Sequence, residues 1–150
     1  ITVLAQGVDG SRESLLYRLQ QEERVCLLGS SSFWEGVDVA GEALSLVIVV
    51  RLPFQPVFEP YTAAKLEKIA KEGRDPFRDY SLPQAVLRFK QGFGRLIRTK
   101  TDRGAFCVLD RRLWEKYYGR YFLQALPEME KVQGTSAEIA WLIHDWLDPL

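Results

Sequence analysis

Short apolar runs that alternate with amphipathic stretches constrain the fold of this 150-residue chain more than any other feature of its sequence. Residues 2–6 (TVLAQ) and 25–29 (VCLLG) predict strands on either side of a helix at 12–23, which Ser11 can cap. The β-branched run 44–52 (LSLVIVVRL) predicts a strand buried on both faces of a parallel sheet. Strands separated by helices of this length form βαβ units, so the sequence predicts an α/β fold.

The same alternation continues toward the C-terminus. Further helices are predicted at 61–72, from Pro83 to about Arg98, at 111–126 and at 136–147, with another buried strand at 105–110. The stretches 53–60, which holds three prolines, and 74–82 are expected to be irregular. Ligands of parallel sheets bind beyond the carboxyl ends of the strands, which places 30–39 and 53–60 on the predicted functional edge.

The composition indicates one folded domain over residues 1–150, because 47% of the residues are hydrophobic and low-complexity tracts are absent. No apolar run is long enough to span a membrane and no secretory signal is visible, so we expect a cytoplasmic protein without a membrane partner. Cys26 and Cys107 lie in apolar runs without metal-ligand spacing, so they are expected to be buried core residues. His144 is the only histidine, which argues against zinc sites and histidine-based triads.

The net charge of zero conceals an uneven distribution. Residues 74–120 hold 12 basic and 5 acidic residues, a net charge of +7, whereas residues 1–73 carry −3 and residues 121–150 carry −4. This basic block makes an anionic partner plausible.

A helix within the basic block collects polar groups along one side. At 100° per residue, Gln91, Arg95, Arg98 and Arg88 share an arc of roughly 80°, opposite an apolar stripe. Gly94 lies at the edge of that arc, although each glycine inside a helix costs about 0.5–1 kcal/mol. Planar guanidinium groups at this density fit a polyphosphate, and the missing side chain leaves room for it.

A second group of polar residues occupies 29–41 (GSSSFWEGVDVAG), between two predicted strands. Glu35, Gly36 and Asp38 suit a tight turn that presents two carboxylates. Ser30, Ser31 and Ser32 can donate hydrogen bonds to phosphate oxygens. A structural interpretation stays open, because Ser32 and Glu35 also fit the capping box of a helix N-terminus. Such an N-terminus binds anions as well.

The phosphate-cradling pattern GxxxxGK[ST] is absent from the 150 residues. Without it this chain should not bind a nucleoside triphosphate well by itself. The arginine helix therefore indicates half of a binding site, whose other half belongs to a second domain.

The segments SFWEGVDVAG…LVIVVRLPF and LPQAVLRFKQGFGRLIRTKTDRGAFCVLDRR resemble the second motor lobe of the DinG/XPD-like superfamily 2 DNA helicases. FWEGVD matches the family's motif V, and QGFGRLIR matches the QxxGRxxR pattern of its motif VI. The resemblance covers about residues 1–127; residues 128–150 form a helical extension without a recognised motif. It implies a RecA-like three-layer domain with a mostly parallel central sheet and helices on both faces.

The resemblance also implies roles for individual residues. Arg95 and Arg98 resemble arginine fingers that reach the γ-phosphate, and Gln91 resembles the residue that orients the attacking water or senses that phosphate. Gly92 and Gly94 would let the helix approach the nucleotide. The remaining matched residues are nucleotide-side and coupling contacts at Glu35, Gly36 and Asp38, and DNA contacts at Ser30, Ser31, Ser32 and the loop after Leu52.

In that family ATP with Mg²⁺ binds between two lobes that walk on single-stranded DNA. The first, N-terminal motor lobe is absent from this chain and would hold the Walker A motif and any iron–sulfur cluster. We therefore expect the C-terminal motor lobe of an ATP-dependent DNA helicase, inactive in isolation. A catalytically silent RecA-like module that binds nucleic acid or regulates a partner is the main alternative. A translocase or a helicase–nuclease fusion is a third.

Overall fold

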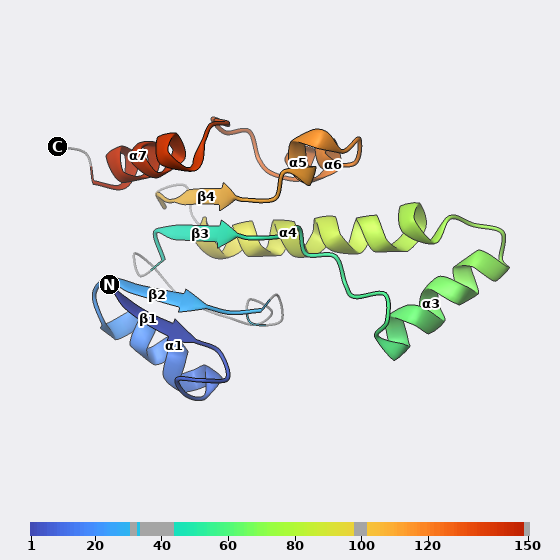
Figure 1. Cartoon of the computed structure of the whole chain (residues 1–150), viewed down its shortest axis with the longest axis horizontal. Coiled ribbons are helices and arrows are strands. Elements are labelled where there is room, and N and C mark those ends of the chain that lie inside the picture. Colours follow the sequence, from blue (N-terminus) through green and yellow to red (C-terminus); the bar gives the residue numbers. More distant parts are fainter. Residues whose placement is uncertain (31–32, 34–43, 98–101, 149–150) are drawn as a thin grey trace. The chain divides into compact units, whose positions relative to one another are not determined.

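The computed structural model describes residues 1–30, 33, 44–97 and 102–148 (Figure 1). Its elements are β1 (Thr2–Ala5), α1 (Arg12–Gln21), β2 (Val25–Leu28), β3 (Leu46–Val49), α3 (Pro60–Lys71), the π-helical turn η2 (Phe77–Ser81), α4 (Leu82–Leu96), β4 (Ala105–Val108), α5 (Arg112–Glu115), α6 (Gly119–Gln124) and α7 (Ser136–Leu147). The chain divides into two compact units. The first contains Ile1–Val47, Gln91–Phe106 and Val132–Leu150, and the second contains Ile48–Lys90 and Cys107–Lys131.

The first unit begins with the predicted βαβ motif. Strands β1 and β2 pair in parallel, with Thr2 opposite Val25 and Ala5 opposite Leu28. Helix α1 connects them, and the Ser11 side chain accepts a hydrogen bond from the Ser14 N–H at its N-terminus, as the sequence predicted. Local capping and hydrophobic spacing are sufficient to specify this motif.

Among the described residues, side chains cover only one face of the β1–β2 pair. The core of this motif consists of Leu4, Leu15 and Phe33, with further apolar side chains packed around them. The opposite face stays open, since Val3 and Leu28 are more than half exposed. Cys26 belongs to that face and is exposed, so the prediction that it is a buried core residue is wrong.

Strands β3 and β4 form a second pair. The Ala105 N–H donates to the Ser45 carbonyl and the Leu109 N–H donates to the Val49 carbonyl, both at 2.9 Å. Because the partners advance by four residues along both strands, the pair is parallel. Val49 is buried whereas the Ile48 side chain is 49% exposed. The prediction of a strand over 44–52 buried on both faces is therefore wrong, because β3 is shorter and exposes Ile48 while it buries Val49.

The helix predicted to begin at Pro83 begins earlier. The π-helical turn η2 follows Pro76 and continues directly into α4, with the Leu82 N–H donating to the Phe77 carbonyl. Residues 76–82 are thus helical rather than irregular. A proline within a helix clashes with the carbonyl four residues before it, and the wider turn relieves this crowding ahead of Pro83.

The helix predicted over 111–126 is broken into α5 and α6. The chain is extended at Lys116, the C-cap of α5, and turns before Gly119. A Cβ atom at residue 119 would collide with the Leu113 carbonyl oxygen. This close backbone approach is a tertiary feature that the amphipathic pattern did not indicate.

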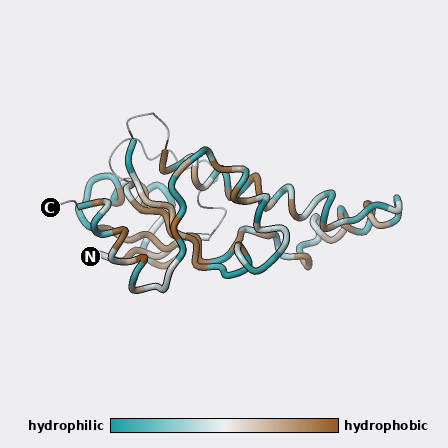
Figure 2. The backbone as a smooth tube through the Cα atoms, turned by 90° about the horizontal axis from the view of Figure 1, so that it is seen from above, coloured by the Kyte–Doolittle hydropathy of each residue, from teal (hydrophilic) through white to brown (hydrophobic). Residues whose placement is uncertain are grey.

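The remaining helices agree with the sequence. Helix α3 is followed by Gly73 at φ +74°, and α7 has the capping box of Thr135 and Glu138. Figure 2 shows that hydrophilic and hydrophobic residues are interspersed along the backbone. Mixed helices and strands with small parallel sheets are consistent with the predicted α/β class. Among the described helices none has the length and apolar character to cross a bilayer.

Candidate functional site

Helix α4 turns the predicted arginine face away from its core residues. Gln91 is exposed, whereas Arg88 and Arg95 are half-buried. The buried side of the helix consists of Leu82, Ala85, Phe89, Phe93 and Leu96. The helical periodicity that placed the polar groups opposite an apolar stripe is therefore correct. Arg98, the fourth member of the predicted face, lies outside the described residues.

The two glycines of α4 have different surroundings. A Cβ atom at Gly94 would meet no other atom within 4 Å, so packing within the described chain does not require a glycine there. Gly94 is exposed one residue before Arg95, which fits the predicted room for a bulky ligand. Gly92 is buried, on the side of the core residues, so the prediction that it faces the nucleotide together with Gly94 is not supported.

Ser30, the first of the predicted serine contacts, follows the carboxyl end of β2. Its N–H and its hydroxyl group both donate to Gln6 Oε1, at 2.9 and 3.1 Å. Gln6 itself follows β1, so one amide side chain joins the ends of two parallel strands. Nearby, a Cβ atom at Gly29 would lie 3.0 Å from the Cβ of the buried Phe33. Ser30 is thereby held at the predicted functional edge.

Ser30, Gln91, Gly94 and Arg95 all belong to the first compact unit. The structure thus brings Gln91, Gly94 and Arg95 together on one helix, with Ser30 at a strand end of the same unit. The other predicted site residues, Ser31, Ser32, Glu35, Gly36 and Asp38, lie outside the described residues. Gln6 was not predicted as a site residue. The sequence signal that could have indicated it is a polar residue directly after an apolar strand.

In the second unit, Asp110 joins the ends of β3 and β4. Its Oδ2 accepts the Leu52 N–H at 2.8 Å, and Arg112 approaches both carboxylate oxygens, with Nε–Oδ1 at 2.9 Å and Nη2–Oδ2 at 2.6 Å. The Arg112 guanidinium, assisted by the Leu52 N–H, lowers the pKa of Asp110 to about 2. We call this arrangement of Asp110, Arg112 and Leu52 the strand clasp. The sequence signal was an aspartate at the end of the strand predicted over 105–110, within LDRR; β4 itself ends at Val108 and is half-buried rather than buried as predicted.

The strand clasp leads into an aromatic cluster that fixes the start of the 53–60 loop. The Arg112 guanidinium lies 5.7 Å from the centre of the Phe54 ring. Phe54 in turn contacts Phe77, Tyr118 and Phe122, with ring centroids 5.6–5.8 Å apart. Such ring pairs stabilise by about 0.5–1.5 kcal/mol beyond their buried area. The loop predicted at the functional edge therefore has a rigid base.

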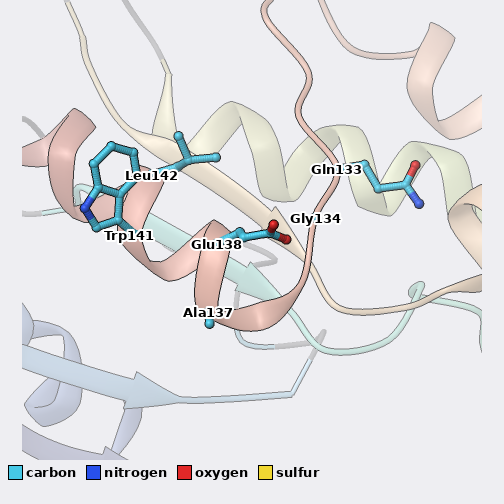
Figure 3. A pocket seen from close by; sticks show the side chains of 6 residues that line it. All are labelled: Gln133, Gly134, Ala137, Glu138, Trp141 and Leu142. Carbon is cyan, nitrogen blue, oxygen red and sulfur yellow. The ribbon is translucent and has the colours of Figure 1, made fainter.

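A shallow hollow of about 560 Å³ lies beside α7 (Figure 3). It is lined by Gln133, Gly134, Ala137, Glu138, Trp141 and Leu142. The only charged group among them is Glu138, whose pKa is lowered by the hydrogen bond it accepts from the Thr135 N–H. A hollow with a carboxylate and without a basic lining residue does not suit a nucleotide phosphate.

The sequence also matches known proteins. A profile of the helicase C-terminal domain matches residues 1–129. The chain belongs to the helicase C-terminal domain family. The predicted resemblance to DinG/XPD-like helicases is thereby confirmed, and α4 and the strand clasp lie within the matched part of this helicase C-terminal domain.

Three relatives illustrate the similarity of this helicase C-terminal domain to longer proteins. The 3'-5' exonuclease DinG of Bacillus subtilis is 45% identical over 140 residues, which cover 93% of this chain and 15% of the relative. The ATP-dependent DNA helicase YoaA of Haemophilus influenzae is 44% identical over 142 residues, covering 95% of this chain and 22% of the relative. The ATP-dependent helicase DinG of Mycobacterium tuberculosis is 38% identical over 125 residues, covering 83% of this chain and 19% of the relative.

The chain therefore spans between 15 and 22% of the length of these curated relatives.

Proposed function

We propose that this helicase C-terminal domain is the second motor lobe of an ATP-dependent DNA helicase that translocates on single-stranded DNA and unwinds duplexes. The lobe has the RecA-like three-layer architecture and works with an N-terminal motor lobe. The observation that carries the proposal is the polar side of α4, where exposed Gln91 and half-buried Arg95 stand beside the open space at Gly94. Family membership and the missing phosphate cradle support it as half of a nucleotide site.

The residues of α4 suit phosphoryl transfer. A guanidinium group offers planar, permanently charged donors that match phosphate oxygens, and the exposed amide of Gln91 can position a water molecule. ATP with Mg²⁺ supplies the phosphoanhydride bond, held mainly by the other lobe. Arg95 and Arg98 stabilise the charge on the γ-phosphoryl oxygens as water attacks and ADP leaves, and such fingers contribute roughly 10³–10⁵ in rate.

In this proposal, single-stranded DNA binds at the carboxyl ends of the parallel strands. Ser30, Ser31 and Ser32 donate to DNA phosphates, and Glu35, Gly36 and Asp38 connect DNA occupancy to the nucleotide. The Ser30 hydroxyl proton is donated to Gln6 Oε1 in this structure, so donation to a DNA phosphate requires that this hydrogen bond rearranges. Any iron–sulfur cluster belongs to the N-terminal lobe.

The test is the ATPase activity of the complete protein that contains this chain. Arg98→Ala and Arg95→Ala should each lower kcat by about a hundred-fold or more, while ATP binding stays nearly unchanged, because a finger acts chiefly in the transition state. Lys90→Ala is the matched control, since Lys90 is an exposed cation on another side of α4. Turnover near wild type in both arginine variants would refute the assignment of the fingers.

A helicase–nuclease fusion is a second candidate, because the relative from Bacillus subtilis is named a 3'-5' exonuclease. Among the described residues of this chain, no group of three His, Cys, Asp or Glu side chains could hold a metal ion. The nuclease centre would therefore lie outside the described residues. Degradation of DNA by the complete protein without ATP, unaltered by Arg98→Ala, would establish it. A silent module would instead show neither ATP turnover nor nuclease activity.

A further inference from the structure

Helix α7 lies beyond the part of the chain that the family profile matches, which ends at residue 129. Its attachment to the first compact unit is slight, because no side chain of Ser136–Leu147, all of which the structure describes, is buried. Ile139, Ile143 and Leu147 are half-buried and follow one another at intervals of four residues, so they share one side of the helix. Helix α7 therefore packs on its unit through this side alone.

Trp146, next to this half-buried side, joins α7 to the two residues that precede β4. Its indole N–H donates to the Gly104 carbonyl at 3.2 Å. The Arg103 guanidinium lies 4.6 Å from the centre of the indole ring, and its Nη2 donates to the Trp146 carbonyl at 3.4 Å. We call Arg103, Gly104 and Trp146 the C-terminal brace. Its three interactions converge on a single residue of α7.

Gly104 connects the C-terminal brace to the end of helix α4. A Cβ atom at residue 104 would lie 2.5 Å from Leu96 Cδ1 and 2.8 Å from Leu96 Cγ, so the Gly104 backbone lies directly against this side chain. Leu96 is buried and is the last residue of α4. Two positions after Gly104, the Phe106 ring packs edge-on against Phe93, with ring centroids 5.5 Å apart. The segment 103–106 thus contacts the last turn of α4, which carries Arg95.

The last turn of α4 is weakly held by interactions within the helix. Gly92 and Gly94 both lie near its end, and glycine disfavours a helix because ordering its backbone loses more entropy than ordering any other residue. The Ile97 N–H donates to the Phe93 carbonyl at 3.3 Å, which is long for a helical hydrogen bond. Contacts from outside the helix must therefore help to keep Arg95 in a fixed place.

We propose that α7 holds the last turn of α4 through the C-terminal brace, and that Trp146 and Arg103 are positioning residues for Arg95. The brace touches no nucleotide. It keeps the Arg95 guanidinium where charge develops on the γ-phosphoryl oxygens, and a small displacement of such a group slows the reaction more than it weakens substrate binding. The inference rests on the proposed function in taking Arg95 as a finger.

Hydrogen–deuterium exchange of the complete protein without nucleotide tests the brace apart from catalysis. Trp146→Ala should speed exchange of the amides of residues 94–97 by about five-fold or more, since contacts that oppose opening of this turn are lost. Trp141→Ala is the matched control, because it removes the same indole from another side of α7, where Trp141 is 65% exposed and lines the hollow. Equal exchange of residues 94–97 in the two variants would contradict the brace.

ATP turnover by the complete protein tests the effect of the brace on Arg95. Trp146→Ala should lower kcat about five- to ten-fold and change the KM for ATP by less than about two-fold, whereas Trp141→Ala should stay near wild type. Trp146→Phe keeps an aromatic ring for the Arg103 guanidinium and should recover part of the loss.

A double-mutant cycle shows whether the brace acts through Arg95. In an Arg95→Ala background, Trp146→Ala should lower kcat by less than about two-fold, because the group that the brace positions is already missing. If Trp146 only supported the fold, the two losses would multiply.

The outcomes distinguish the brace from the proposed function. If the wild-type complete protein does not hydrolyse ATP, both are wrong. If Arg95→Ala lowers kcat but Trp146→Ala matches Trp141→Ala in exchange and turnover, only the brace is refuted. Thermal melting checks folding, and if Trp146→Ala melts far below Trp141→Ala, Arg103→Gln takes its place in each assay, since it leaves the indole and its bond to Gly104 intact.

Discussion

Replacing Asp110 by asparagine removes the charge of the strand clasp while keeping an acceptor for the Leu52 N–H. The Asp110 side chain is only 8% exposed, and its pKa is lowered from 3.8 to about 2. The lowered pKa corresponds to about 2 kcal/mol as an upper value, at 1.36 kcal/mol per pKa unit. Because the Arg112 side chain is 41% exposed, water screens part of this. We expect Asp110→Asn to cost about 1–2 kcal/mol at pH 7.

The direction of the pH dependence follows from the lowered pKa. The charged carboxylate stabilises the folded state above pH 3.8, the value in the unfolded chain, and this contribution disappears as the pH falls through about 2. The free energy of unfolding of the wild type should therefore approach that of Asp110→Asn as the pH is lowered from 5 to 2.

Urea denaturation of both proteins across this pH range measures the difference. Glu115→Gln is the control, because Glu115 pairs with Arg111 at the surface and its loss should change stability by less than about 0.5 kcal/mol. A difference between wild type and Asp110→Asn that is absent at pH 7, or that stays constant down to pH 2, would refute the electrostatic role of the clasp.

Three further predictions concern glycines and the predicted coupling residue. Gly94→Ala should leave the fold intact or stabilise it by about 0.5–1 kcal/mol, since a Cβ meets open space, yet lower the ATPase activity of the complete protein; unaltered kinetics would show that nothing approaches Gly94. Gly119→Ala should lower the melting temperature by several degrees because of the collision with Leu113, and an unchanged melt would contradict that packing. Glu35→Gln should preserve the melting temperature and remove most DNA stimulation of the ATPase, whereas normal stimulation would leave Glu35 a purely structural residue.

Local sequence signals predicted those parts of the fold that local interactions decide. Ser11 caps α1, and α7 begins and ends at the predicted residues 136 and 147, because caps and apolar spacing act within one or two turns. The break between α5 and α6 depends on the approach of Gly119 to Leu113, and the exposure of Cys26 depends on which sheet face a helix covers. The periodicity of apolar residues within one segment predicts neither the break between the helices nor the exposure of Cys26.

The candidate site likewise has features that local sequence predicted and features that it did not. The polar side of α4 follows from helical periodicity, and the structure bears out its orientation for Gln91 and Arg95. The bond from Ser30 to Gln6 and the bond from Leu52 to Asp110 join residues 24 and 58 positions apart. No local pattern specifies such pairs, because they form only when the strand ends meet.

We propose above all that this chain provides half of an ATP site. The most direct measurement compares ATP turnover by the purified 150-residue chain with turnover by the complete protein, under the same conditions and with single-stranded DNA present. We expect no turnover above background from the chain alone and DNA-stimulated turnover from the complete protein. Substantial hydrolysis by the isolated chain would contradict it.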